Sequence, residues 1–235
     1  MTTEADVAQA AVSGGRRRVA RVEYAIRRST RARRVRVAVH DDGTVEVVLP
    51  PRGTREWADS AVRELRPWID RRLAEVAVTQ DRLAARGDAV PCLGDALRLV
   101  AEPGRTRAHR RGDALLVPAG DWRPAAERWF RREARAQLAP RVDAACATLG
   151  VRHAGITVRG QRTRWGSCSS RGSLSFNWRL LLAPAPVLDA VVWHECCHLV
   201  HLDHSPRFWA LLAEHCPGWD DAHGWLREHG RELVL

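Results

Sequence analysis

Alternating apolar and polar residues predict a β-rich first half of the chain. At 35–39 every second residue is valine, and after the sequence Asp41-Asp42-Gly43 every second residue at 45–49 is again apolar (Val45, Val47 and Leu49). Two runs of period two joined by a glycine-containing turn are typical of a β-hairpin. Further short strands are expected at 97–100, 115–117, 155–158 and 173–178.

Apolar residues three and four positions apart predict the helices. One helix is expected over 54–78, with a break near Pro67, and a longer one over 124–149. The segment 186–199 is strongly helical, and Ser205 followed by a proline predicts the start of another helix. This order of elements predicts an α+β protein. Its expected parts are a disordered tail (1–18), a small β-rich N-terminal subdomain with one long helix (19–120) and a catalytic domain (121–235).

The composition is that of an ordinary globular protein. Of the 235 residues, 45% are hydrophobic and 28% are charged. No apolar run reaches the roughly 18 residues that cross a bilayer, so no membrane association is expected. The N-terminus lacks the pattern of a secretory signal, and the six cysteines form no C-x-x-C pair. These features predict reduced thiols in the cytoplasm and no cysteine-based zinc ribbon.

The chain is strongly basic, and its charge is unevenly placed. The formal net charge is +10, all 38 basic residues are arginine, and ten of them lie between Arg16 and Arg36. Such a run is the usual electrostatic signature of a nucleic-acid or phosphate partner. A solvated basic face, partly due to a coding bias toward arginine, explains the same run, and the sequence leaves both interpretations open.

The segment His194-Glu195-Cys196-Cys197-His198 matches the pattern H-E-x-x-H and lies inside the expected helix 186–199. Residues four apart share one helix face, so the two imidazoles can bind one ion. Glu195 then projects beside the metal, where it can accept a proton from bound water. Cys196 and Cys197 turn away from that face and are interpreted as small buried residues.

A catalytic zinc site needs a third protein ligand and an open fourth position. His204 is the candidate for the third ligand, which requires the helix to end between His198 and His204. His201 is a competitor for the same position, or a residue that faces the substrate. The sequence therefore predicts one Zn²⁺ per chain. A methionine-containing turn beneath the metal, as in metzincins, is excluded because the chain has methionine only at position 1.

Four segments resemble the YgjP-like metallopeptidase family, which is related to the SprT-like and WLM-type zinc proteases. They are RWGSC at 164–168, LSFNWRL at 174–180, WHECCHL at 193–199 and DHSPRFW at 203–209. The resemblance implies a zincin-like metallohydrolase domain in which His194, His198 and His204 bind zinc and Glu195 is the general base.

The leading hypothesis is a zinc metallopeptidase that cleaves peptide bonds of a peptide or protein with a Glu195-activated, zinc-bound water. Residues 173–178 are expected to form an edge strand that pairs with an extended substrate. The candidates for contacts with the substrate or transition state are Arg164, Trp165, Asn177 and His201.

Two other functions stay open. A Mg²⁺- or Mn²⁺-dependent nucleoside triphosphate pyrophosphohydrolase would use the same motif, with nearby arginines (Arg162, Arg164, Arg171 and Arg179) binding phosphates. A nucleic-acid-associated protease would use the arginine-rich N-terminal region to bind DNA or RNA.

Overall fold

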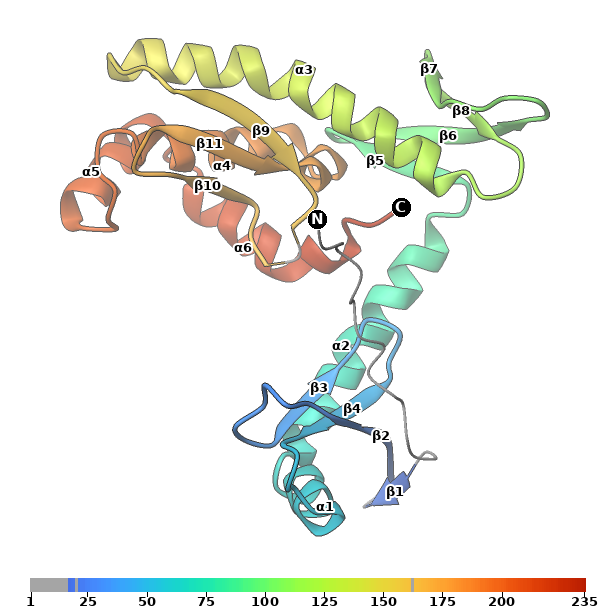
Figure 1. Cartoon of the computed structure of the whole chain (residues 1–235). Helices are drawn as coiled ribbons and strands as arrows, with labels where there is room; N and C mark the ends of the chain where they lie inside the picture. The colour runs from blue at the N-terminus through green and yellow to red at the C-terminus, as the bar shows by residue number, and fades with distance from the viewer. Residues whose placement is uncertain (1–16, 20, 162) are drawn as a thin grey trace, which may run out of the picture. The chain divides into compact units, whose positions relative to one another are not determined.

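The computed structural model describes residues 17–19, 21–161 and 163–235 (Figure 1). The chain forms two compact units that divide between Ala85 and Arg86. Of the expected tail 1–18, residues 1–16 lie outside the described residues, whereas Arg17 and Arg18 belong to the first strand. The two units divide earlier in the chain than the boundary expected between 120 and 121.

The N-terminal unit contains a four-stranded sheet. Its strands are β1 (Arg17–Val19), β2 (Val22–Arg28), β3 (Arg36–Val39) and β4 (Val45–Leu49), in the order β1-β2-β4-β3. The expected hairpin is present as the antiparallel pair β3–β4, and Gly43 in its turn has a φ of 81°. The sequence did not predict β1 and β2, because their many arginines obscure the alternation of Val22, Tyr24 and Ile26.

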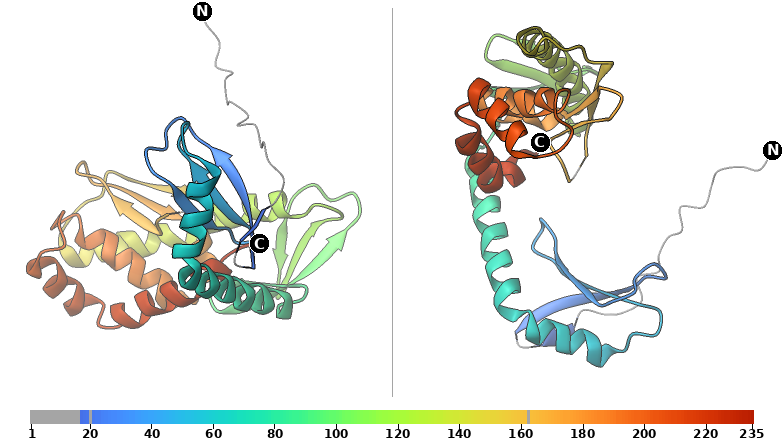
Figure 2. Two further views of the ribbon diagram at one scale, coloured as in Figure 1. Left: turned by 90° about the horizontal axis from the view of Figure 1, so that it is seen from below. Right: turned by 90° about the vertical axis from the view of Figure 1, so that its left-hand side faces the viewer.

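Two helices pack against this sheet (Figure 2). The expected helix 54–78 is two helices, α1 (Arg55–Glu64) and α2 (Arg66–Ala85), separated at Leu65. Pro67 occupies the second position of α2, where a missing N–H costs no hydrogen bond. The core of this unit joins sheet and helices through Tyr24, Val47, Leu49, Ala58, Val62 and Ile69.

The C-terminal unit begins with a second four-stranded sheet. Its strands are β5 (Ala89–Cys92), β6 (Asp95–Glu102), β7 (His109–Arg111) and β8 (Ala114–Pro118), in the order β5-β6-β8-β7. Val90, Leu97 and Leu115 from this sheet enter the same hydrophobic core as the helices that follow. This shared core places the sheet in the second unit rather than in the first.

The expected long helix is present as α3 (Arg123–Leu149). It ends at Gly150, which has a φ of 65° and donates its N–H to the carbonyl of Ala147, while Val151 donates to Cys146. Figure 1 shows α3 running beside β9 and the second sheet. Its buried stripe includes Phe130, Leu138 and Val142, so α3 joins the sheets and helices of this unit.

A third sheet, of three strands, precedes the helix that bears the H-E-x-x-H segment. It contains β9 (Gly155–Arg159), β10 (Gly166–Cys168) and β11 (Ser173–Asn177), in the order β10-β11-β9. The expectation that residues 173–178 form an edge strand is corrected here, because β11 pairs with β9 on one side and with β10 on the other. The edge strand nearer α4 is β10.

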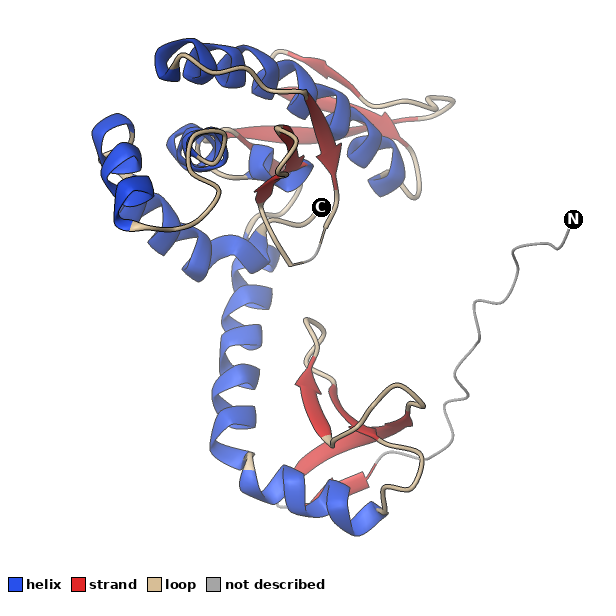
Figure 3. Ribbon diagram, turned by 60° about the vertical axis from the view of Figure 1, so that its left-hand side comes forward, coloured by secondary structure: helices blue, strands red, loops and turns tan. Residues whose placement is uncertain are grey.

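The last elements are predominantly helical. A 3₁₀ turn, η1 (Trp178–Leu182), leads into α4 (Ala185–Cys197), and α5 (Pro206–His215), α6 (Trp219–His229) and η2 (Gly230–Glu232) follow. Figure 3 shows the loop that separates α4 from α5. Helix α4 packs against α3, α5, α6 and β10, so most of its side chains are buried. Helix α6 was not predicted.

The described elements confirm an α+β fold. The same three-stranded motif recurs in all three sheets, because β2-β4-β3, β6-β8-β7 and β9-β11-β10 each place the third strand, in chain order, between the other two. None of the described helices is long and apolar enough to cross a lipid bilayer. All six cysteines are free thiols.

Replacement of Leu138 by alanine is expected to destabilise the protein by about 2–5 kcal/mol, because this side chain is fully buried and its loss leaves a cavity. Arg128→Ala, on the same helix, is the control. Arg128 is exposed, so its replacement should change the free energy of unfolding by no more than about 0.5 kcal/mol. Urea unfolding followed by circular dichroism measures both, and equal effects of the two substitutions would contradict the assigned core.

Candidate metal centre

Three histidine side chains converge in the C-terminal unit. His194 and His198 lie one turn apart at the end of α4, and His204 lies in the loop before α5. One ring nitrogen of each lies within 4.8 Å of the others. The Nε2 atoms of His194 and His204 are 3.2 Å apart. The expected convergence of these three residues is therefore present.

The end of α4 brings His204 back toward the helix. The helix ends at Cys197, and His198 is its C-cap residue. The N–H groups of Val200 and His201 both bond to the carbonyl of Cys197, which turns the chain away from the helix axis. The next helix then begins at Pro206. The prediction that the helix ends between His198 and His204 is confirmed.

His201 acts on this cluster through its backbone. Its carbonyl oxygen lies 2.9 Å from Nδ1 of His198. Nδ1 must carry the proton in that hydrogen bond, which leaves Nε2 of His198 with a free lone pair. The imidazole of His201 is not among the three converging rings. His201 therefore orients His198, and the structure does not place it as the third ligand.

Phe208 lies against all three imidazoles. Its ring centroid is 5.0 Å from that of His194, 4.5 Å from that of His198 and 4.8 Å from that of His204. The side chain is fully buried. Sequence reasoning assigned Phe208 no role, although its position four residues after His204 at the start of a helix was a usable signal. It supplies the apolar support for the three rings.

The ring of His194 is oriented by stacking, and not by a hydrogen bond at Nδ1. Its buried Nδ1 atom has no hydrogen-bond partner among the described residues. Instead, the ring stacks on Trp219 of α6, with 4.4 Å between centroids and 18° between planes. The ring of His223 also stacks on Trp219, with 5.3 Å between centroids and 6° between planes. Sequence reasoning missed Trp219, because α6 itself was not predicted.

The surroundings of His194 and His198 favour their neutral forms. Burial, together with the smaller effects of neighbouring His198, His204 and His223, lowers the pKa of His194 to about 3. Burial also lowers the pKa of His198. A neutral imidazole offers the lone pair that a metal needs, and a set of three imidazoles fits a divalent cation that prefers nitrogen ligands, such as Zn²⁺.

Glu195 is buried between α4 and the edge strand β10. Its side chain is 5% exposed, and burial raises the pKa of its carboxyl group to about 7, an effect that Arg164 opposes. The carboxyl group lies directly against the backbone of Gly166. A Cβ at Gly166 would lie only 2.6 Å from Cγ of Glu195. Gly166 is thus required for the position of Glu195, a constraint that the sequence did not reveal.

The other predicted site residues have different surroundings. Arg164 is exposed, and it is close enough to Glu195 to lower its pKa. Trp165 is half-buried, and its ring lies against Gly230. Asn177 is 4% exposed and donates its side-chain amide to the carbonyls of Gln161 and Arg164, at 2.6 and 3.4 Å. Asn177 therefore supports the loop that carries Arg164, and its amide is engaged there.

Cys196 and Cys197 are fully buried, as the sequence suggested. Neither belongs to the group of converging ligand atoms. Burial raises the pKa of both thiols, that of Cys197 to about 11. They therefore remain neutral thiols that pack in the core.

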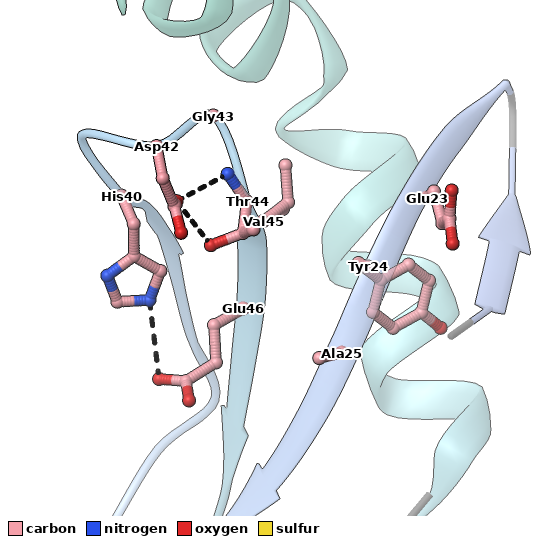
Figure 4. A pocket seen from close by; sticks show the side chains of 9 residues that line it. All are labelled: Glu23, Tyr24, Ala25, His40, Asp42, Gly43, Thr44, Val45 and Glu46. Carbon is pink, nitrogen blue, oxygen red and sulfur yellow. Dashed lines mark hydrogen bonds and ion pairs between the residues drawn. The ribbon is translucent and has the colours of Figure 1, made fainter. Parts of the chain in front are cut away.

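A separate cavity of about 470 Å³ lies in the N-terminal unit (Figure 4). None of the predicted site residues lines it. Its carboxylates have partners within the unit, because Asp42 accepts hydrogen bonds from Thr44 and Glu46 accepts one from Arg27 at 2.9 Å. This cavity therefore offers no set of free ligand groups comparable to the three histidines.

A family model for the YgjP-like metallopeptidase domain matches residues 33–229. The match covers most of the chain, and the chain therefore belongs to the YgjP-like family, as the four segments suggested. The domain makes the protein a hydrolase of the metallopeptidase type, and the family implies a metal ion. No curated protein and no solved structure matches the chain.

Replacement of Trp219 by leucine is expected to weaken metal binding by roughly 10- to 100-fold, because the stack that orients His194 is lost. Trp219→Phe keeps an aromatic ring and should bind metal within about 3-fold of the parent protein. Titration with Zn²⁺ against a chelating dye measures both affinities, and circular dichroism checks that each variant is folded. A folded leucine variant that binds metal as tightly as the parent would show that stacking does not orient His194.

Proposed function

We propose that this protein is a zinc-dependent metallopeptidase in which His194, His198 and His204 hold one Zn²⁺ and Glu195 is the general base. The observation that carries the proposal is the convergence of three imidazole nitrogens next to a buried carboxyl group. Three protein ligands leave a fourth position open, which distinguishes a catalytic zinc site from a structural one.

The metal would act as a Lewis acid at this site and lower the pKa of water next to it. Each histidine has its own support. The carbonyl of His201 orients His198, Trp219 stacks on His194, and Trp209 stacks on His204 with 5.4 Å between centroids. These supports keep the three lone pairs directed at one point before any ion binds.

Glu195 is suited to accept a proton from the attacking water. A general base works best when its pKa is near the working pH, and burial raises the pKa of Glu195 to about 7. The carboxylate form is favoured by positive charge nearby, which Arg164 and a bound cation would supply. After bond cleavage the same carboxyl group would deliver the proton to the leaving amine.

The edge strand β10 is the surface on which we place the substrate backbone. Among the described strands, β10 pairs only with β11, so its other edge is open to an extended peptide. Glu195 lies against Gly166 of this strand, so a peptide paired with β10 would pass beside the carboxyl group. Arg164, which immediately precedes Trp165 and β10, is our candidate for contact with the developing oxyanion.

The two alternatives have weaker support. For phosphoanhydride hydrolysis, Arg164 remains a candidate, but Arg179 stacks over Trp178 at 4.7 Å and Arg162 lies outside the described residues. For nucleic-acid binding, part of the arginine-rich stretch has protein partners. Arg27 pairs with Glu46, and Arg28 donates to the carbonyls of Pro51 and Gly53. Exposed Arg31, Arg33 and Arg34 leave that prediction open.

The zinc-loaded protein is expected to hydrolyse an unfolded protein substrate and to lose this activity when a chelator removes the metal. Glu195→Gln should retain about one zinc per chain and lose at least about 100-fold in turnover, because an amide cannot accept the proton. Metal analysis and a peptide-cleavage assay check both points. Release of pyrophosphate from nucleoside triphosphates with Mg²⁺ or Mn²⁺, without peptide cleavage, would reject the proposal in favour of the phosphohydrolase.

Gly166→Ala is expected to reduce peptide hydrolysis by roughly 10- to 100-fold with the zinc content unchanged. The new Cβ would lie 2.6 Å from Cγ and 2.7 Å from Cδ of Glu195, so the carboxyl group must move. Ser167→Ala, on the same strand, is the matched control and should stay within about 3-fold of the parent rate. Full activity of the Gly166 variant would argue against the assigned position of the base.

A further inference from the structure

Exposed apolar side chains in the C-terminal unit gather around the histidine cluster. Within the described residues 86–161 and 163–235, four large apolar side chains are strongly exposed. They are Val200 (42%), Leu202 (61%), Trp209 (42%) and Val234 (38%). Three of the four lie in one stretch of ten residues that also contains His204. We call Val200, Leu202 and Trp209 the apolar rim.

Trp209 connects this rim to the predicted metal site. One face of its ring stacks on His204 at 5.4 Å and 30°, and its centroid is 6.3 Å from that of His194. An edge contact with Phe208, at 5.1 Å and 86°, fixes the ring on the cluster. The ring is nevertheless 42% exposed. Trp209 therefore presents apolar surface to solvent within contact distance of two histidines of the cluster.

Val200 and Leu202 lie on the loop that joins the second and third histidines. Val200 comes two residues after His198, and Leu202 comes two residues before His204, so each backbone position lies within about 7 Å of a histidine backbone. The hydrogen bonds from Val200 and His201 to the carbonyl of Cys197 anchor the loop to α4. These apolar side chains are thus held at the site and are not part of a mobile terminus.

The rim has the composition of a binding surface for apolar groups. Exposed apolar residues that cluster, with charged residues between them, are typical of interaction sites, and Asp203 and Arg207 supply the charges here. Val200 and Leu202 are aliphatic and have no group that binds phosphate, so a nucleotide substrate does not account for their exposure at the site. In folded proteins large apolar side chains are mostly buried, so a partner that presents them is an extended or unfolded polypeptide.

We propose that the apolar rim selects the substrate. The preferred substrates are unfolded polypeptides whose large apolar side chains, next to the scissile bond, pack on the apolar rim. This inference rests on the proposed peptidase function and adds the substrate class to it. The backbone of the substrate would pair with β10, while its apolar side chains would contact the rim.

The test uses the full-length, zinc-loaded protein and two pools of quenched fluorescent peptides. The pools share the same flanking residues and differ in two central positions, which are Leu, Phe or Val in one pool and Ser, Asn or Gly in the other. The parent protein is expected to cleave the apolar pool with a kcat/KM at least about 10-fold higher. Equal cleavage of both pools would overturn the inference and leave the peptidase function intact.

Three variants test whether the apolar rim causes the preference for the apolar pool. Leu202→Ser and Val200→Ser should each lower kcat/KM for the apolar pool by at least about 5-fold, with little change for the polar pool and in zinc content. Val234→Ser removes an exposed apolar residue outside the rim, and it should change neither the kcat/KM for the apolar pool nor that for the polar pool. Retention of the full preference in both rim variants would overturn the assignment of the rim. Absence of cleavage of either pool by the zinc-loaded parent would overturn the proposed function and the inference together.

Discussion

The convergence of three imidazoles depends on the end of helix α4 at His198. Were the helix to continue, the six residues from His198 to His204 would carry the third histidine about 9 Å along the axis, out of reach of the other two. The carbonyl of Cys197 accepts two N–H groups at this turn, and α5 begins at Pro206. The end of the helix therefore determines the positions of both His204 and Phe208.

Aromatic packing around the cluster determines its chemistry as well as its geometry. Phe208, Trp209 and Trp219 each lie against one or more of the imidazoles. Burial then lowers the pKa of His194 and raises that of Glu195. The same low-dielectric surroundings thus favour the neutral form of His194 and a Glu195 carboxyl group that titrates near neutrality, as the proposed hydrolysis requires.

The third sheet connects Glu195, the base that we propose, to the strand edge on which we place the substrate. Strand β10 lies at the sheet edge next to α4, and Gly166 leaves room for the carboxyl group of Glu195. Asn177 on the central strand holds the loop that carries Arg164. One short segment, residues 163–168, thereby supplies a positive charge near Glu195, space for its carboxyl group and a strand edge that is unpaired among the described strands.

The sequence by itself determined the local part of this site. The spacing of His194 and His198 within one helix, the helix stop before His204, the β3–β4 hairpin and the YgjP-like resemblance all depend on residues close together in the chain. Only the tertiary structure decided that β10 is the edge strand, that the second sheet belongs to the C-terminal unit, and that Trp219 and Gly166 position His194 and Glu195. The last two contacts join residues more than twenty positions apart. Such contacts depend on how whole elements pack, and a local pattern of apolar residues does not specify that packing.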